Sequence, residues 1–361
     1  MRRFRLLLVF AFVAMLSVPA WAQTKRKVII DQDALGPART DLNSILVLLQ
    51  SPEVEPLGIT VVTGDGWRDE EVAHALRMLE IIGRPEVPVV PGAVFPLVNS
   101  QTGIENWQKQ FGKIRYLGAW HAEYPGWKYH DPFVVPDLKE GNPTIKPANE
   151  DAAHFLIRMV RQHPHEVTIY AAGPLTNLAL ALALDPQFPE LAKELILMGG
   201  SMNPTTDDPE FTHSPQREFN FQFDPEATHA VLHARWAKIV CTTVDISVKT
   251  LVRKEMVDEI AQSSLPAAQY VAKYTRTGSY MWDELAAAAW IDPSIITKEE
   301  MIYMDGEIDH GAGYGNTLSW APGMNPGLGE QLVHVQVGLD TNKLYKLFVR
   351  LMTSPTPGTH K

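Results

Sequence analysis

Short apolar runs that suit strands alternate along the chain with segments whose apolar positions recur at helical spacing. Residues 28–30 form a β-branched run, which indicates a buried strand of a parallel sheet, and residues 41–49 follow with helical spacing. A strand at 56–63, an amphipathic helix at 68–82 and a short strand at 87–90 come next. This β-α-β-α-β order is typical of a parallel sheet with crossover helices.

The same alternation returns after residue 150. It predicts a helix at 151–162, a strand at 167–170, an Ala/Leu-rich helix, a strand at 195–198, a helix at 225–234, a strand at 239–244, helices at 254–262, 266–274 and 285–290, and two antiparallel strands within 331–352. We therefore expect a single α/β domain with a mostly parallel central sheet flanked by helices.

Residues 95–147 form an aromatic-rich insertion in which neither periodicity is visible. A stretch of this length without secondary structure is usually a functional lid or a disordered segment, and the density of aromatic residues argues against disorder. Residues 107–129 carry several of the tryptophans and tyrosines. We expect this part either to cover a pocket or to pack over the sheet edge.

The N-terminus has the pattern of an export signal. Arg2, Arg3 and Arg5 precede an apolar run over 6–19, and residues 20–22 fit a small-x-small cleavage site. The run is too short for a stable membrane span, although an uncleaved anchor is the alternative. We expect a signal peptide at 1–22, a mature domain at 23–361 that is periplasmic or secreted, and no membrane attachment after cleavage.

Charge and cysteine content narrow the class of protein. The formal net charge is −10, and removing the three signal arginines takes it to −13. Nucleic-acid binding relies on clustered Lys and Arg, so an acidic chain argues against it. Cys241, the single cysteine, lies in an apolar run and excludes an internal disulfide; we expect it to be a core residue.

Carboxylates gather where the first strand passes into the first helix. Asp31 and Asp33 leave the strand, and Asp41 opens the helix. Ligands of open α/β sheets bind at the carboxyl ends of the strands, and adjacent anions repel unless they are protonated or neutralised by a cation. An oxygen-only set favours Ca²⁺ or Mg²⁺. The alternative is that Asp41 is an N-cap and Asp31 a turn residue.

Several motifs in register resemble the inosine-uridine type of nucleoside hydrolase. They are Asp-x-Asp after the first strand, Gly-Ile-Thr-Val-Val-x-Gly around the second, Gly-Pro-Leu-Thr-Asn at 173–177, Met-Gly-Gly at 198–200, Glu-Phe-Asn at 218–220, and a late Asp that opens an apolar helix. The resemblance covers most of the mature chain and suggests a secreted bacterial-type member. It implies a single α/β domain, hydrolysis of the N-glycosidic bond of ribonucleosides to free base and ribose, and a role in purine or pyrimidine salvage.

The resemblance also implies one Ca²⁺ at the carboxyl edge of the sheet and assigns site residues. Asp33 matches the metal ligand that acts as general base on the attacking water, Asp41 the ligand at the helix start, Ala172 a backbone-carbonyl ligand, and Asp283 the last ligand, which also contacts ribose. Asp31 is expected in the first or second shell of the metal. Glu218 and Asn220 match residues that hold the ribose hydroxyls. The family tends to form homodimers or homotetramers.

Three positions depart from the family pattern. Thr40 replaces the first of two adjacent aspartates, in a loop about three residues longer than usual. Asp65 stands in place of the usual Asn and either takes over a ribose or metal contact or caps a turn. Trp282 stands where purine-accepting members carry a histidine that protonates the leaving base; Tyr280, His213 and His130 are candidate replacements.

Two other functions compete with nucleoside hydrolysis. Asp-x-Asp after a strand also opens haloacid-dehalogenase-like phosphatases, which bind Mg²⁺, but no convincing lysine and late acidic pair accompany it here. The second alternative is an extracytoplasmic nucleoside- or sugar-binding protein without turnover, suggested by the changes at Thr40 and Trp282.

Overall fold

The computed structural model describes residues 25–120 and 130–359, so the expected signal peptide lies outside the described residues. Its strands are β1 (Arg26–Gln32), β2 (Val54–Val61), β3 (Val89–Pro91), β4 (Val167–Ala171), β5 (Glu194–Met198), β6 (Ile239–Thr242), β7 (Ile296–Gly306), β8 (Thr317–Trp320) and β9 (Leu332–Leu339). They form one nine-stranded sheet in the order β3-β2-β1-β4-β5-β6-β9-β7-β8. Neighbours from β3 to β9 are parallel, and β7 is antiparallel to both β9 and β8.

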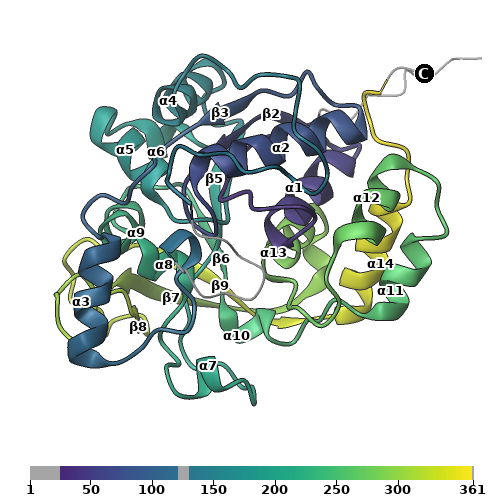
Figure 1. Ribbon diagram of the computed structural model, residues 1–361. Coiled ribbons are helices and arrows are strands. Elements are labelled where there is room, and N and C mark those ends of the chain that lie inside the picture. The colour runs from purple at the N-terminus through teal and green to yellow at the C-terminus, as the bar shows by residue number, and fades with distance from the viewer. Residues whose placement is uncertain (1–24, 121–129, 360–361) are drawn as a thin grey trace, which may run out of the picture.

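Helices cover both faces of this sheet (Figure 1). One face carries α1 (Thr40–Gln50), α2 (Arg68–Ile82), α11 (Lys254–Ile260), α12 (Pro266–Tyr274), α13 (Trp282–Ile291) and α14 (Thr341–Met352). The other carries α4 (Ala152–Gln162), α5 (Thr176–Leu184), α6 (Phe188–Leu191) and α9 (Pro225–Leu232). In β1, Val28 and Ile30 belong to the first apolar cluster and Ile29 to the second, as the two-residue period of a strand requires. The predicted α/β domain with a mostly parallel sheet is confirmed.

The remaining helices lie in the loops around the sheet. They are α3 (Gln101–Phe111), η1 (Gly118–Trp120), α7 (Pro209–Thr212), α8 (Phe219–Phe223), α10 (Val244–Ser247) and η2 (Pro293–Ile295). No helix in the described part of the chain is long and apolar enough to span a bilayer. Cys241 is buried in β6, and burial raises the pKa of its thiol, as expected for a core residue.

Two secondary-structure predictions were wrong. The insertion contains α3, whose start is capped by the Ser100 side chain and which buries only Ile104 and Trp107; so narrow an apolar stripe gave little helical signal. Residues 331–352 form β9 followed by α14 instead of two strands. The Asp340 side chain caps α14 by accepting hydrogen bonds from the backbone amides of Asn342 and Lys343. The strand therefore ends at Leu339, and the helix begins at Thr341.

Candidate active site

A pocket of about 1090 Å³ opens at the carboxyl ends of the parallel strands. Most residues predicted from the sequence to bind substrate or metal line it: Thr40, Asp41, Asp65, Ala172, Glu218, Asn220, Trp282 and Asp283. Asp33 and Asp31 are not among the lining residues. The site residues in the segments that follow β1, β2, β4 and β5 therefore lie together at one edge of the sheet, as the topology predicts.

Asp33 lies immediately behind the pocket wall, enclosed by backbone. Its residue is 2% exposed, and Oδ2 accepts a hydrogen bond from the backbone amide of Asp65 at 2.9 Å. Its Oδ1 has no hydrogen-bond partner among the described residues. A Cβ at Gly64 would lie 2.2 Å from Oδ2 and one at Gly173 would lie 2.8 Å from Oδ1, so both positions require glycine.

Asp41 and Asp283 come from the first turns of two helices that pack together, α1 and α13. A helix N-terminus favours a negative charge, which partly offsets the burial of these carboxylates. Asp41 Oδ2 is buried and, within the described residues, has no hydrogen-bond partner. Asp283 Oδ2 accepts a hydrogen bond from Gln32 Nε2 at 2.9 Å.

Burial and neighbouring negative charges raise the pKa of all three carboxylates. Burial raises the pKa of Asp33 well above its usual range, and the charges of Asp41 and Asp65 raise it further. Burial and the charges of Asp65 and Asp283 do the same for the pKa of Asp41. Burial and the charge of Glu284 raise the pKa of Asp283. Such a cluster needs protons or a cation to be stable at neutral pH.

The donor set fits a hard cation. Its members are oxygen atoms, two of them buried without a hydrogen-bond partner, and the Ala172 carbonyl accepts only a long hydrogen bond, 3.4 Å, from Asn220 Nδ2. Across the described residues, however, no three of these carboxylates bring one oxygen each within 4.8 Å of one another. Binding an ion here therefore requires these side chains to move closer or neutral oxygens to complete the coordination.

Asp31 does not line this pocket, and among the described residues its buried Oδ1 has no hydrogen-bond partner. Its Oδ2 accepts hydrogen bonds from Thr60 Oγ1 and from Asn177 Nδ2, the latter at 2.9 Å. Burial raises the pKa of Asp31 to about 7. Its contacts join β1 to β2 and to the start of α5, so a supporting role suits its position better than direct metal contact.

Glu218 and Asn220 are held at the start of α8. Glu218 caps this helix by accepting hydrogen bonds from the backbone amides of Asn220 and Phe221, and its Oε2 also accepts one from the Gly200 amide at 2.9 Å. Asn220 Nδ2 donates to the Met198 carbonyl at 3.2 Å. Both side chains are thereby oriented by the ends of β4 and β5 while they line the pocket.

Thr40 and Asp65, the two departures beside the acidic cluster, have definite partners. Thr40 Oγ1 donates to Glu284 Oε2 at 2.7 Å and accepts a hydrogen bond from the backbone amide of Asp283 at 3.1 Å. Burial raises the pKa of Asp65, whereas Arg39 and a hydrogen bond from Tyr116 oppose that rise. Thr40 thus positions Asp283, and Asp65 lies in the pocket wall.

Comparison with known proteins identifies the family. The family description "Inosine-uridine preferring nucleoside hydrolase" matches residues 28–346. The chain belongs to this family. It is 28% identical to a probable uridine nucleosidase 2 from Arabidopsis thaliana, over 76% of this chain and 80% of the relative. It is also 28% identical to an inosine-uridine preferring nucleoside hydrolase from Crithidia fasciculata, over 89% of this chain and 96% of the relative.

A solved purine-preferring ribonucleoside hydrolase from Gardnerella vaginalis has the same fold, with a TM-score of 0.72 and 22% identity over 91% of this chain and 98% of that chain. The family hydrolyses the N-glycosidic bond of ribonucleosides, so the chain is a member of an N-glycosyl hydrolase family.

Sequence reasoning missed three buried residues at or behind the wall of this nucleoside hydrolase pocket, of which Glu284 lines it. Gln32 donates to Asp283, to Ser44 Oγ and to the Asp41 carbonyl, and so joins the two helix starts. Glu284 is buried, and burial raises its pKa to about 7. Glu71 is buried in α2 and accepts a hydrogen bond from the Gly66 amide. Gln32 and Glu284 adjoin predicted site residues, but nothing in the helical pattern around Glu71 signals its place.

Aromatic residues form part of the pocket wall. Trp282 contacts Tyr280 and Phe211, with ring centroids 4.8 and 5.6 Å apart. Tyr280 and His213 line the same pocket. His130 also lines it, but Nε2 lies 2.9 Å from Glu70 Oε2 and Nδ1 lies 2.9 Å from the Asp131 carbonyl, so both ring nitrogens are engaged.

The aromatic insertion has two separate roles. Trp107 and Trp120 are buried in a cluster with Trp67 and Phe223, and Trp120 stacks on Phe223 at 4.3 Å between centroids. Residues 113–116 and 136–139 instead line the pocket. The insertion therefore both packs and borders the pocket; residues 121–129, which belong to the predicted cover, lie outside the described residues.

Proposed function

We propose that this protein hydrolyses ribonucleosides to free base and ribose with a water activated by Asp33. The observation that carries the proposal is the buried, oxygen-only cluster of Asp33, Asp41 and Asp283 at a pocket of about 1090 Å³, in a member of the nucleoside hydrolase family. A pocket of this size can hold a nucleoside.

The cation proposed for the cluster is Ca²⁺. Asp33, Asp41, Asp283 and the Ala172 carbonyl would hold it, because they supply hard oxygen ligands whose mutual repulsion it relieves. When bound, Ca²⁺ would lower the pKa of an attacking water and orient vicinal ribose hydroxyls. Asp31, which contacts Thr60 and Asn177, would support this site from behind.

The side chains divide the remaining tasks. Asp33 Oδ2 is fixed by the Asp65 amide, which leaves Oδ1 to take the proton from the attacking water. Asp283, Glu218 and Asn220 would hold the ribose hydroxyls from three sides of the pocket. The carboxylates around the sugar would stabilise the positive charge that develops on the ribosyl group as the bond to the base breaks.

At the other end of the pocket, Trp282 would stack on the base. A stacked aromatic contributes about 1–3 kcal/mol per base in single-strand binding proteins. An indole cannot act as the proton donor that a histidine provides at this position in purine-accepting members. Tyr280 and then His213 are the proposed donors to the leaving base.

The decisive experiment is a reducing-sugar assay of the mature protein with purine and pyrimidine nucleosides in the presence of Ca²⁺. Release of ribose supports hydrolysis. Binding of nucleosides without ribose release would identify a binding protein, and release of phosphate from phosphorylated substrates would identify a phosphatase. Either result would refute the proposed reaction.

A matched test addresses the cation by stability. Asp41→Asn removes one of the repelling charges, so in EDTA we expect this variant to melt at a higher temperature than the wild type. With Ca²⁺ the order should reverse, because the variant lacks a ligand, and metal analysis should find the ion only in the wild type. A stoichiometric ion retained by the variant, or none in the wild type, would refute the assignment.

We also propose that the chain is exported, and that residues 1–22 are removed. The N-terminal sequence of the protein recovered from the periplasm or medium tests this, since a cleaved product should begin near Gln23. A homodimer or homotetramer, proposed from the resemblance, is tested by sedimentation of the mature protein.

A further inference from the structure

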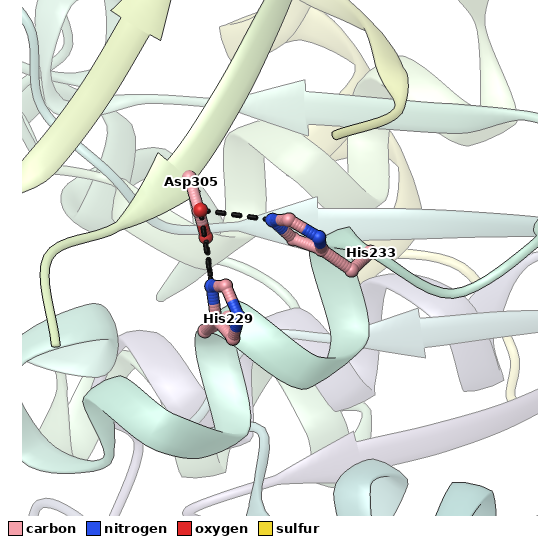
Figure 2. Close-up of side chains that lie close together, drawn as sticks. All are labelled: His229, His233 and Asp305. Carbon is pink, nitrogen blue, oxygen red and sulfur yellow. Dashed lines mark hydrogen bonds and ion pairs between the residues drawn. The ribbon is translucent and has the colours of Figure 1, made fainter. Parts of the chain in front are cut away.

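Two histidines and an aspartate meet outside the pocket, between α9 and β7. His229 lies in α9, His233 follows one turn later, and Asp305 lies near the end of β7 (Figure 2). The backbone amide of His233 still bonds the His229 carbonyl at 3.1 Å, so the helical turn places both rings on one face. None of the three lines the pocket of the hydrolase.

Both imidazole rings contact the Asp305 carboxylate. His229 Nδ1 lies 2.9 Å from Oδ1 and 3.0 Å from Oδ2, and His233 Nε2 lies 2.9 Å from Oδ2. The two rings are 4.1 Å apart between centroids. In the part of the chain that the structure describes, this is the one group of three metal-ligating side chains whose ligand atoms all lie within 4.8 Å of one another.

The charges around Asp305 leave room for a cation. Its side chain is 10% exposed, and among the described residues its ion-pair partners are the two histidines, with no lysine or arginine within reach. Neither histidine is a permanent cation, and among the described residues no lysine or arginine is paired with this carboxylate. The His229 side chain is 35% exposed and that of His233 is 16% exposed, so an ion can enter from solvent.

The surroundings also orient the ligands. The backbone amide of Gly306 donates to Asp305 Oδ1 at 2.8 Å, which fixes the carboxylate. A Cβ at Gly329 would lie 3.2 Å from His233 Nδ1, so the loop before β9 passes close to the far edge of this ring and limits its rotation. Support of this kind for the ligands is typical of metal sites.

We propose that His229, His233 and Asp305 form a second metal site, which binds a transition-metal ion such as Zn²⁺. Two imidazole nitrogens and one carboxylate oxygen are a ligand set suited to such ions. Ligand atoms about 2.0–2.1 Å from a tetrahedral ion are about 3.3 Å apart. The separations between each ring nitrogen and the carboxylate, 2.9–3.0 Å, therefore need to open by only about 0.3–0.4 Å, and the two nitrogens lie within 4.8 Å of each other. Water completes the coordination, and the ion replaces the direct contacts between the ring nitrogens and the carboxylate.

Bound metal would join α9 to β7, two elements that belong to different parts of the sequence. The site would therefore stabilise the antiparallel end of the sheet and take no part in nucleoside hydrolysis. Ca²⁺ and Mg²⁺ prefer six or more oxygen ligands or an octahedral oxygen shell, so neither should compete here.

The experiment is a calorimetric titration of the chelator-treated full protein with Zn²⁺ in saturating Ca²⁺, which occupies any oxygen-only site. Co²⁺ absorption in the visible range provides a second readout of tetrahedral nitrogen and oxygen coordination. We expect one equivalent of Zn²⁺ and a rise in melting temperature. His233→Gln and Asp305→Asn should each weaken binding at least about tenfold, since even residues that only support a metal ligand contribute about 10–100-fold.

His154→Gln is the matched control, because His154 Nδ1 lies 2.6 Å from Asp151 Oδ2 on an exposed helix surface and has no third ligand. This variant and Asp41→Asn should bind Zn²⁺ like the wild type. His229→Gln serves in place of Asp305→Asn if the latter does not fold. Absence of stoichiometric Zn²⁺ in the wild type, or equal binding in His233→Gln, would overturn the proposal, whatever the hydrolase assay shows.

Discussion

Thr40→Val tests whether the threonine that replaces the usual acidic residue positions Asp283. Valine keeps the shape of threonine and removes one hydroxyl, which now donates to Glu284 Oε2 and accepts from the Asp283 amide. Both partners are buried, with residues 1% and 2% exposed. The variant therefore leaves a buried acceptor and a buried donor without their partner.

Each buried group left without a hydrogen bond costs about 1–3 kcal/mol. Thr40 itself is half-buried, so water can reach part of the gap, and Asn43 Nδ2 still donates to the other Glu284 oxygen at 3.2 Å. We therefore expect Thr40→Val to lower the free energy of unfolding by about 2–3 kcal/mol, near the lower end for two groups. Displacement of Asp283 should also lower kcat/KM at least about tenfold, which corresponds to about 1.4 kcal/mol.

Urea unfolding and initial rates of uridine hydrolysis measure these two effects. Thr40→Ser keeps the hydroxyl and is the matched control, which should stay within about 0.5 kcal/mol of the wild type, the usual range for a substitution that breaks no such contact. If Thr40→Val is as stable and as active as Thr40→Ser, the hydroxyl does not position Asp283 and the reasoning is wrong.

Three further predictions concern the base wall, the insertion and a surface carboxylate. Because Trp282 stands where a histidine would act as general acid, which contributes about 10²–10⁴ in rate, p-nitrophenyl riboside should react much faster than inosine. Trp282→His should selectively accelerate inosine hydrolysis, and Trp282→Ala should not. Comparable wild-type rates on both substrates would contradict this. Tyr116→Phe removes the hydrogen bond to Asp65 and should lower kcat/KM with little loss of stability. Trp120→Ala, which removes a buried stacked ring, should instead lower the free energy of unfolding by about 3–5 kcal/mol. The reverse pattern in unfolding and kinetics would show that we assigned their roles wrongly. Burial alone would raise the pKa of Glu80, but hydrogen bonds from Thr144, Arg77 and backbone amides lower it to about 2. Glu80→Gln should therefore be less stable than the wild type at pH 7. In unfolding experiments this difference should shrink as the pH falls from about 4.5 towards 2.

The parallel half of the fold was predictable from the sequence because its signals are local. Strands such as β4 and β5 are short apolar runs, and α2 has a clear amphipathic stripe whose bounds were predicted without error. β7 lies near the sheet edge, and its polar residues at 297–300 are exposed, so the short apolar run at 301–304 that follows them was missed. The helical nature of α14 was missed because the alternation of β9 runs directly into it.

The candidate site likewise contains residues that local sequence signals could place and residues that they could not. Asp33, which leaves a strand end, and Asp41, which opens the helix after it, could be placed together because the loop between them lies at the carboxyl edge of the parallel sheet. The contacts of Gln32 and Thr40 with Asp283 join positions more than 240 residues apart, and no sequence pattern signals such a pair. Likewise, His229 and His233 form a visible i, i+4 pair, but their partner Asp305 comes 76 residues after His229.

The glycines that enclose Asp33 carry a consequence for the protein's tolerance of mutation. Neither Gly64 nor Gly173 has a positive φ, so alanine would be acceptable to the backbone at both positions. The obstacle is Asp33 and its neighbour Pro174. A methyl group at Gly64 would lie 2.2 Å from Asp33 Oδ2 and 2.7 Å from Pro174 Cδ, and one at Gly173 would lie 2.8 Å from both Oδ1 and the backbone nitrogen of Asp33. In a saturation library selected for ribose release, these two positions should therefore accept fewer residues than many positions in the core, although neither contributes a side chain to the chemistry. Variants there should keep much of their fold and lose turnover, so that a stability screen alone would misclassify them as neutral.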